Sequence, residues 1–385
     1  MENTEIIQKA RAKAEMWLND AYDKATRTEV ERLLNASDPT ELIDSFYNDL
    51  EFGTGGLRGI MGVGSNRMNI YTVRKATQGL ANYIKKQGGE KKGVAIAYDS
   101  RFMSPEFADV AALCLAANGI KAYVFDELRP TPELSFALRT LGCISGIVVT
   151  ASHNPPEYNG YKVYWEDGAQ VTSPKDKEII DEVKAVTDYA KVLTMDKEAA
   201  VAAGLYQVIG AEIDDAYMVE LKKQIIHPEV IREMADEIKI VYTPFHGTGN
   251  KPVRRVLSEL GFKHVYVVPE QELPDPEFTT LDYPNPEDPK AFTLALKLAK
   301  EKNADIVMAT DPDADRLGIY ALDTKSGEYV PFTGNMSGML IAEYILRERT
   351  ATGTMPGNPA MVKTIVTTNM ADPIAADYNV KLIEV

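Results

Sequence analysis

A serine follows directly on an apolar stretch that has the pattern of a buried strand. Gly146-Ile-Val-Val-Thr150 is mostly apolar and β-branched, and it runs into Ala-Ser-His-Asn-Pro-Pro, which predicts a strand that ends abruptly at a loop. Ser152 therefore stands at the carboxyl end of a strand, where open α/β sheets build their sites. His153, Asn154 and Lys162 add polar groups nearby, and we call residues 150–162 the serine loop. An ordinary strand exit with an Asx turn is the alternative.

A second loop holds three aspartates at alternate positions. This aspartate loop, Asp311-Pro-Asp-Ala-Asp-Arg316, follows the apolar stretch Ala304–Thr310. Like charges repel, so the three carboxylates need a cation between them, and hard oxygen ligands suit Mg²⁺ or Ca²⁺. A calcium EF-hand is excluded, because Arg316 and Leu322 stand where that loop needs Gly and Glu. Mg²⁺ usually adds a phosphate oxygen to its carboxylates, and Arg316 could bind that anion. A solvated acidic turn is the alternative.

Glycines are dense between Phe52 and Arg67, with Arg58 among them. The spacing matches neither a Walker loop nor Gly-x-Gly-x-x-Gly, because Arg58 occupies the last place of the latter. Backbone N–H groups at glycines can approach an anion closely, and Arg58 could hold a phosphate. A flexible surface loop is the alternative.

Four segments resemble the signatures of the α-D-phosphohexomutases, and they occur in that family's order. Two are the serine loop, Thr150-Ala-Ser-His-Asn-Pro with Asn159-Gly-Tyr-Lys162, and Asp311-Pro-Asp-Ala-Asp-Arg-Leu-Gly318. The others are Phe52-Gly-Thr-Gly-Gly-Leu-Arg-Gly59 and Tyr242-Thr-Pro-Phe-His-Gly-Thr-Gly249. The long form of the glycine-rich segment, Gly53 to Asn69, is similar to the phosphoglucomutase/phosphopentomutase branch. The resemblance runs from about residue 40 to the end of the sequence.

The resemblance implies an isomerase that moves a phosphoryl group within a sugar phosphate by way of a phosphoserine at Ser152. The expected reaction interconverts glucose 1-phosphate and glucose 6-phosphate, with glucose 1,6-bisphosphate as intermediate and activator. Mg²⁺ is the implied cofactor, and its expected ligands are an oxygen at Ser152 and the carboxylates of Asp311, Asp313 and Asp315.

The resemblance also assigns roles to the basic residues near these loops. Arg58, Lys162 and Arg316 are expected to bind the phosphorylated substrate, and Arg58 and Lys162 also count as catalytic. The attacking sugar hydroxyl must lose a proton, and Lys162 or His153 is the nearest group to assist. Phosphoryl transfer leaves little covalent work to side chains, so positioning and charge neutralisation dominate.

Several other functions fit parts of the pattern. Ribose or mannose phosphates are alternative substrates, which would make the protein a phosphopentomutase or a phosphomannomutase. A metal-dependent phosphatase or phosphotransferase would lose the phosphoserine to water. A catalytically silent sugar-phosphate binding protein is a third class, but it has no need for both Ser152 and the three aspartates.

The composition limits which classes of partner and which cellular compartment we expect for this protein. The chain has 385 residues, 45% of them hydrophobic and 26% charged, which is typical of a globular protein of two or three domains. The net charge of −15 disfavours nucleic acid. No apolar run approaches the length of a membrane span, and the amino terminus lacks a signal-peptide core. Cys114 and Cys143 lie in apolar surroundings and read as core residues. We expect a cytoplasmic monomer or homodimer.

An alternation of strands and helices positions the two loops. It predicts an α/β fold of consecutive phosphoglucomutase-type domains, with mixed sheets sandwiched by helices. Domain I is expected to span residues 1–205 and to contain the glycine-rich segment around Arg58 and the serine loop. Domain II is expected to span residues 206–322 with the aspartate loop, and residues 323–385 to form part of a domain III. Against the family's pattern, we expect the third domain to be incomplete and the fourth to be absent. Residues 184–205 are expected to form a mobile, charged connection.

Three further expectations concern single segments. Arg101 follows a predicted strand, and it either approaches the serine loop or forms a structural salt bridge. His246 is expected to stabilise a turn rather than to act in catalysis. In the last part of the chain, a hairpin from Asp323, a helix at Asn335–Arg349 and strands at Thr364–Thr367 and Lys381–Val385 are predicted.

Overall fold

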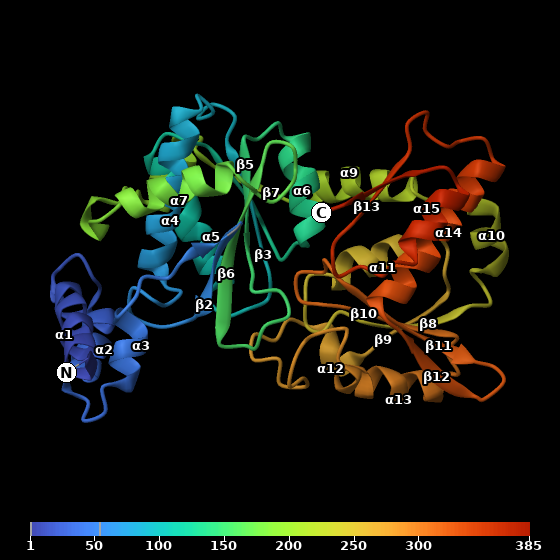
Figure 1. Ribbon diagram of the computed structural model, residues 1–385, viewed down its shortest axis with the longest axis horizontal. Helices are drawn as coiled ribbons and strands as arrows, with labels where there is room; N and C mark the ends of the chain where they lie inside the picture. Colours follow the sequence, from blue (N-terminus) through green and yellow to red (C-terminus); the bar gives the residue numbers. More distant parts are fainter. Residues whose placement is uncertain (1, 54) are drawn as a thin grey trace.

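The computed structural model describes residues 2–53 and 55–385, and Figure 1 shows three parts that follow one another along the chain. Within these described residues, the sheets have seven, five and two strands in chain order. Helices accompany every sheet, so the predicted α/β class with mixed sheets is confirmed. None of the helices described is long and apolar enough to span a bilayer.

The first sheet is parallel on one side and antiparallel on the other, in the order β1-β2-β6-β5-β3-β4-β7. Strand β3 pairs parallel with β4 and β5, and β4 pairs parallel with β7, whereas β6 pairs antiparallel with β2 and β5. The loops after β3, β4 and β5 therefore leave the sheet at one edge. The strands are β1 Phe52–Gly53, β2 Gly56–Ile60, β3 Val94–Tyr98, β4 Ala122–Phe125, β5 Ser145–Val149, β6 Tyr158–Trp165 and β7 Tyr206–Ile209.

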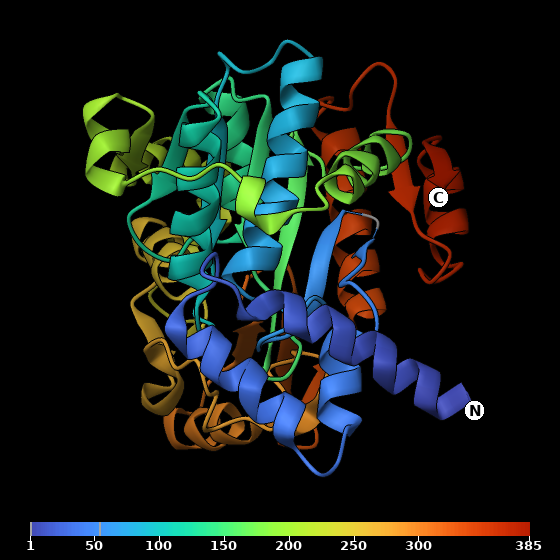
Figure 2. The ribbon, with the colours of Figure 1, turned by 90° about the vertical axis from the view of Figure 1, so that its left-hand side faces the viewer.

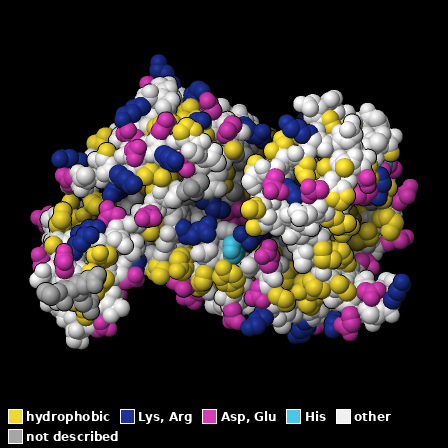
Figure 3. All heavy atoms as spheres, viewed as in Figure 1, with side chains coloured by type: hydrophobic (Ala, Val, Ile, Leu, Met, Phe, Trp, Pro, Cys, Tyr) yellow, Lys and Arg dark blue, Asp and Glu magenta, His cyan; other side chains and the backbone are white. Residues whose placement is uncertain are grey.

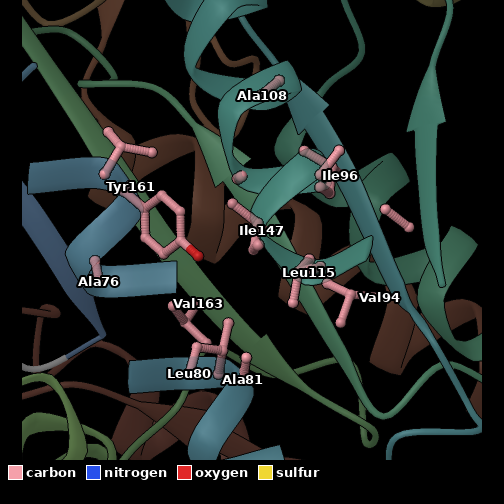
Figure 4. Close-up of a cluster of buried hydrophobic side chains, with 14 of the residues drawn as sticks. Ala76, Leu80, Ala81, Val94, Ile96, Ala108, Leu115, Ile147, Tyr161 and Val163 are labelled. Carbon is pink, nitrogen blue, oxygen red and sulfur yellow. The ribbon is translucent and has the colours of Figure 1, made fainter. Parts of the chain in front are cut away.

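Helices cover both faces of this sheet because side chains alternate along its strands. Ile96 belongs to the core that also includes residues of α4 and α5, whereas its neighbour Ala97 belongs to the core under α6. Figure 4 shows the first of these cores, where Tyr161 and Ile147 of the sheet lie among side chains from helices α4 and α5. The helices are α4 Ile70–Lys86, α5 Ser104–Ala117, α6 Thr131–Thr140 and α7 Lys175–Ala185.

The amino-terminal helices form a lobe of their own beside the first sheet (Figures 1 and 2). Their core is aromatic: the Trp17 ring stacks on Tyr22 with centroids 4.6 Å apart and meets Tyr71 of α4 edge-on at 5.5 Å. The helices of this lobe are α1 Glu2–Glu15, the 3₁₀ turn η1 Met16–Leu18, α2 Lys24–Asn35 and α3 Thr40–Phe46.

The prediction of a mobile connection at residues 184–205 is wrong for its second half, which packs on the first domain. Helix α8, Lys197–Ala202, contacts α5 and β7, and Ala200 is fully buried. Lys197 forms an ion pair with Asp109 at 2.7 Å. The chain then enters β7, which pairs with β4, so the first sheet continues past the boundary expected after residue 205. The 3₁₀ turn η2, Tyr189–Lys191, lies earlier in this segment, before α8.

The second sheet has the order β12-β11-β10-β8-β9 and carries the aspartate loop after β10. Helix α13 packs on β8 and β10, and Phe292 and Val307 lie in the core between them. The elements are α9 Ala211–Lys222, α10 Pro228–Met234, β8 Lys239–Thr243, α11 Asn250–Glu259, β9 His264–Val267, α12 Pro269–Glu272, η3 Pro289–Phe292, α13 Thr293–Lys302, β10 Ile306–Thr310, β11 Leu317–Asp323 and β12 Glu328–Phe332.

The last part of the chain departs from the expectation in two places. The hairpin from Asp323 does not open a third unit, because β12 pairs with β11 in the second sheet. The strand predicted at Thr364–Thr367 is also wrong: these residues form a turn closed by a hydrogen bond from the Thr367 N–H to the Thr364 carbonyl at 2.9 Å. The observed elements are α14 Gly334–Ala351, β13 Ala360–Lys363, α15 Ala371–Asp377 and β14 Lys381–Glu384.

Candidate active site

Ser152 lies at the end of β5 in a left-handed backbone conformation, with φ of 54°. Such a conformation is unfavourable for a residue other than glycine and clusters at functional sites. The Ser152 N–H donates to Thr150 Oγ1 at 2.8 Å, and the Thr150 hydroxyl donates to buried Asp99 at 2.6 Å. The serine side chain is buried and donates to Oδ2 of Asp311 at 2.9 Å. The two polar loops predicted from sequence therefore meet at this hydroxyl.

Arg101 holds the turn that carries the serine. Its guanidinium is buried and donates to the carbonyl of Ser152 at 2.7 Å, to that of Pro155 at 2.8 Å and to that of Tyr158 at 3.0 Å, with a further bond to the Asn154 carbonyl. Its Nε lies 3.3 Å from Oδ2 of Asp99. Both roles left open for Arg101 by the sequence are thus present together.

The three aspartates come together as the spacing predicted. One carboxylate oxygen from each of Asp311, Asp313 and Asp315 lies within 4.8 Å of the others, and Asp311 and Asp313 are fully buried. Lys162 from β6 donates to Oδ2 of Asp313 at 2.7 Å and lies 3.5 Å from Asp315. The other oxygen of Asp313, Oδ1, is buried and has no hydrogen-bond partner among the described residues. A buried acceptor beside two more carboxylates and a serine oxygen is a donor set that fits Mg²⁺.

The charges of this cluster are unbalanced. Burial raises the pKa of Asp311 well above its usual value, and Asp313 and Asp315 raise it further. Burial and the charge of Asp313 raise the pKa of Asp315 as well. Burial acts the same way on Asp313, but the charge of Lys162 and the hydrogen bonds to the carboxylate outweigh it, so the pKa of Asp313 is lowered. Although burial opposes its charge, the carboxylates raise the pKa of Lys162. One ammonium thus faces three carboxylates, an excess that a divalent cation would neutralise.

His153 lies against the serine hydroxyl, with Nδ1 3.1 Å from Ser152 Oγ. Burial, together with the positive charges of Arg316 and Arg58, lowers the pKa of His153 to about 4. The ring of Tyr283, from the loop between α12 and η3, meets the imidazole edge-on at 5.7 Å. His153 is therefore a neutral imidazole, held from the side of the second domain.

The two predicted arginines are exposed at the rim of the site. Arg58 on β2 donates weakly to Oδ1 of Asn154 at 3.5 Å, and the Arg316 N–H donates to Oδ1 of Asp311 at 3.0 Å. Figure 3 shows Lys and Arg side chains gathered beside a histidine in the hollow at the centre of this face. Exposed guanidinium groups at the rim can bind a phosphate through paired N–H donors.

The Thr-Pro-Phe-His-Gly segment, residues 243–247, packs against the aspartate loop at Pro312. His246 is buried, with Nδ1 2.8 Å from the Leu273 carbonyl and Nε2 2.8 Å from Thr280 Oγ1, which agrees with the turn-stabilising role expected for it. A Cβ at Gly247 would lie 2.5 Å from the Cα of Pro312, so only glycine permits this approach. The next residue, Thr248, donates its N–H to the Pro312 carbonyl at 2.9 Å.

One close neighbour of the aspartates went unrecognised in the sequence. Thr131, the first residue of α6, donates its hydroxyl to Oδ2 of Asp313 and its N–H to the Asp313 carbonyl, both at 2.9 Å. In the sequence the segment Thr131-Pro-Glu reads only as the start of a helix. A helix start after a parallel strand of the same sheet was the available signal, because such starts lie at the edge where sites form.

Comparison with protein families matches this architecture. The family model for phosphoglucomutase/phosphomannomutase, alpha/beta/alpha domain I, matches residues 49–190, and the model for alpha/beta/alpha domain II matches residues 215–324. The two matches together cover more than half of the chain. The chain belongs to the phosphoglucomutase/phosphomannomutase family, which confirms the resemblance seen in its motifs.

Curated relatives carry two activity names. The human phosphopentomutase is 38% identical over 338 residues, which is 86% of this chain and 55% of that protein. A phosphoglucomutase from Staphylococcus aureus strain N315 is 34% identical over 373 residues, 96% of this chain and 64% of that protein. The chain therefore spans 55% to 64% of the length of these relatives.

Solved structures agree on the fold. A phosphoglucomutase/phosphomannomutase family protein from Burkholderia thailandensis aligns with a TM-score of 0.63 at 22% identity, covering 86% of this chain and 65% of that one. The open form of pp63/parafusin from Paramecium aligns with a TM-score of 0.64 at 19% identity, covering 88% and 62%. At these identities the likeness concerns the fold alone.

Proposed function

We propose that this protein is a phosphosugar mutase that interconverts glucose 1-phosphate and glucose 6-phosphate through a phosphoserine at Ser152. The observation that carries the proposal is the meeting of Ser152 Oγ and Asp311 Oδ2 at 2.9 Å, from loops 159 residues apart in the chain. A nucleophilic hydroxyl beside three clustered carboxylates suits phosphoryl transfer, in which charge neutralisation supplies most of the catalysis.

The reaction has two balanced half-steps. The free hydroxyl of a sugar monophosphate attacks the phosphorus on Ser152, the bond from phosphorus to Oγ breaks, and glucose 1,6-bisphosphate forms. Ser152 Oγ then attacks the other phosphate of this bisphosphate, which regenerates the phosphoserine and frees the isomeric monophosphate. Each attacking hydroxyl loses one proton, and each leaving oxygen takes one up.

The surrounding side chains divide the remaining work. His153 is the group placed to accept and return the proton, because its Nδ1 lies 3.1 Å from Ser152 Oγ. Lys162 keeps its charge beside Asp313 and stabilises the negative phosphoryl oxygens. Arg58 and Arg316 bind the phosphate groups from the rim. Mg²⁺ held by Asp311, Asp313, Asp315 and an oxygen on Ser152 would supply further positive charge when bound.

A second candidate is phosphopentomutase activity, and the name of the 38% identical human relative favours it. Glucose and ribose phosphates offered separately, with product identified by mass and chromatography, distinguish the two. The cytoplasmic location and the monomeric or dimeric assembly stay predictions from the sequence.

The test is the modification and turnover of the Ser152→Ala variant. The parent chain, incubated with glucose 1,6-bisphosphate, should gain one phosphoryl group that peptide mapping places on Ser152, and Ser152→Ala should gain none. Turnover should fall by about 10⁴-fold or more in the variant, because the covalent route is lost. The matched control is Ser37→Ala, at an exposed serine far from the site.

Three results separate this proposal from its rivals. A fully active Ser152→Ala would contradict the phosphoserine route. Release of inorganic phosphate without isomerised product would indicate a phosphatase. Failure of the bisphosphate to modify Ser152, together with tight binding of sugar phosphate, would indicate a binding protein.

A further inference from the structure

Asp313 receives three donors from the first domain, although it belongs to the second. Its Oδ2 accepts from the Thr131 hydroxyl at 2.9 Å and from Lys162 Nζ at 2.7 Å, and its carbonyl accepts from the Thr131 N–H at 2.9 Å. Thr131 is 6% exposed, so water does not compete effectively for these bonds. The carboxylate is therefore fixed in both position and rotation from outside its own loop.

This arrangement distinguishes the two oxygens of the carboxylate. Oδ2 is occupied by the Thr131 hydroxyl and the Lys162 ammonium, whereas Oδ1 is buried and has no hydrogen-bond partner in the part of the chain that the structure describes. An unpartnered buried carboxylate oxygen is costly unless a cation or donor completes it. Oδ1 is thus the oxygen left for a cation shared with Asp311 and Asp315.

The position of Thr131 in its helix explains why its backbone N–H is free to donate to Asp313. It is the first residue of α6, so its N–H has no partner within the helix, and Pro132 follows it. The positive end of the helix dipole also points toward the aspartate loop, which favours negative charge there. A valine would keep the shape of the side chain and the N–H bond and would lose only the hydroxyl.

We propose, on the basis of the function proposed above, that Thr131 is a positioning residue of the metal site, which holds Oδ2 of Asp313 so that Oδ1 faces the cation. Thr131 does not touch the reacting atoms and acts through Asp313. Partners of this kind orient metal-binding carboxylates, and their loss typically weakens metal affinity by about 10- to 100-fold.

The test compares metal affinities of the full chain and its variants, in the same phosphorylation state, by calorimetric titration with Mg²⁺ and by the bound signal of Mn²⁺. Thr131→Val should bind about 10-fold or more weakly, and Thr131→Ser, which keeps the hydroxyl, should stay within about threefold of the parent. The matched control is Thr140→Val, at the exposed far end of the same helix, which should bind as the parent does. Asp313→Asn should lose binding.

The variants also separate this role from a merely structural one. If Thr131→Val is less stable but binds Mg²⁺ as the parent does, the proposal is wrong and Thr131 only packs. Thr131→Ala, which cannot overfill the site, replaces Thr131→Val if the latter does not fold, and parent-like affinity in it has the same meaning. If Asp313→Asn also binds as the parent does, the aspartates are not the metal site, and the proposed function fails with the present inference.

Discussion

The side chain of Arg101 shows how much of the candidate site depends on one buried residue. It bonds to four backbone carbonyls of the serine loop and lies 3.3 Å from the fully buried Asp99, which in turn accepts from Thr150 and Ser104. The ring of Phe278, from the second domain, lies over its guanidinium with 5.1 Å to the ring centroid. The left-handed conformation of Ser152 is held by these bonds.

Replacement of Arg101 by methionine should lower the free energy of unfolding by about 3–5 kcal/mol, because it leaves the buried carboxylate of Asp99 without its cationic partner and four backbone carbonyls without this donor. Urea unfolding measures the loss. The control is Arg32→Met, which removes an exposed guanidinium and should leave stability unchanged. Parent-like stability of Arg101→Met would mean that other groups hold the loop.

Helices α6 and α9 meet through an acidic pair formed by the buried Glu133 and the partly exposed Asp214. Burial, a hydrogen bond with Asp214 and the charge of Asp214 raise the pKa of Glu133 to about 8. Burial also disfavours the charged form of Asp214, but the hydrogen bonds and charge of Arg129 and the bond from Glu133 lower the pKa of Asp214. The charge of Arg255 also lowers the pKa of both carboxyl groups. The helix contact thus contains a neutral Glu133 beside an ionised Asp214.

This pair should make stability depend on pH. Between the ordinary pKa of 4.5 and about 8, the folded state keeps a proton on Glu133 that the unfolded state has lost, so stability should fall as pH rises through this window. One proton corresponds to at most about 1.4 kcal/mol per pH unit. Glu133→Gln removes the titration, and its unfolding free energy should fall less than that of the parent between about pH 5 and about pH 8.

The control for this prediction lies on the facing helix. Glu212→Gln changes an exposed carboxyl on α9 and should keep the pH dependence of the parent. Equal slopes for the parent and Glu133→Gln would show that Glu133 is ionised in the folded protein at neutral pH.

At the scale of the whole molecule, the candidate site lies between two domains that are each folded around their own sheet. Domain I contributes Ser152, Lys162 and Thr131, and domain II contributes the aspartate loop. The loop after α12 also crosses to domain I, where Phe278 and Tyr283 contact Arg101 and His153. Binding at the aspartates should therefore stabilise the docking of both domains.

Addition of Mg²⁺ should raise the unfolding free energy of the chain, by about 2.7 kcal/mol at a hundredfold excess over the dissociation constant, and a chelator should reverse the effect. Thermal unfolding at constant ionic strength measures it, with sodium chloride as the control for general screening. Asp313→Asn should show no such shift. A shift of equal size in Asp313→Asn would place the bound cation elsewhere.

The third part of the chain differs from the first two in its surface. Helix α14 exposes Leu340, Ile341, Tyr344 and Ile345, and the turn after β13 exposes Ile365 and Val366 by 83% and 81%. Its two strands, β13 and β14, form a small parallel sheet. A local pattern of apolar β-branched residues at 364–367 predicted a strand there, but no strand among the described residues pairs with it.

The sequence by itself determined the local features of this protein. Apolar, β-branched runs that stop at polar loops predicted the strands before Ser152 and Asp311, because alternation and turn residues act over a few neighbouring positions. The motifs also established the family. The carboxylate spacing predicted a cation site, since three like charges at alternate positions need one.

Only the tertiary structure decided how distant groups meet. Thr131 and Asp313 are separated by 182 residues, and their contact depends on sheet order and on the docking of two domains, which no local pattern encodes. The same holds for Arg101, whose carbonyl partners lie 51 to 57 residues away. The pairing of strand β7 with β4 is likewise a long-range contact, because the paired residues of the two strands lie more than 80 positions apart in the chain.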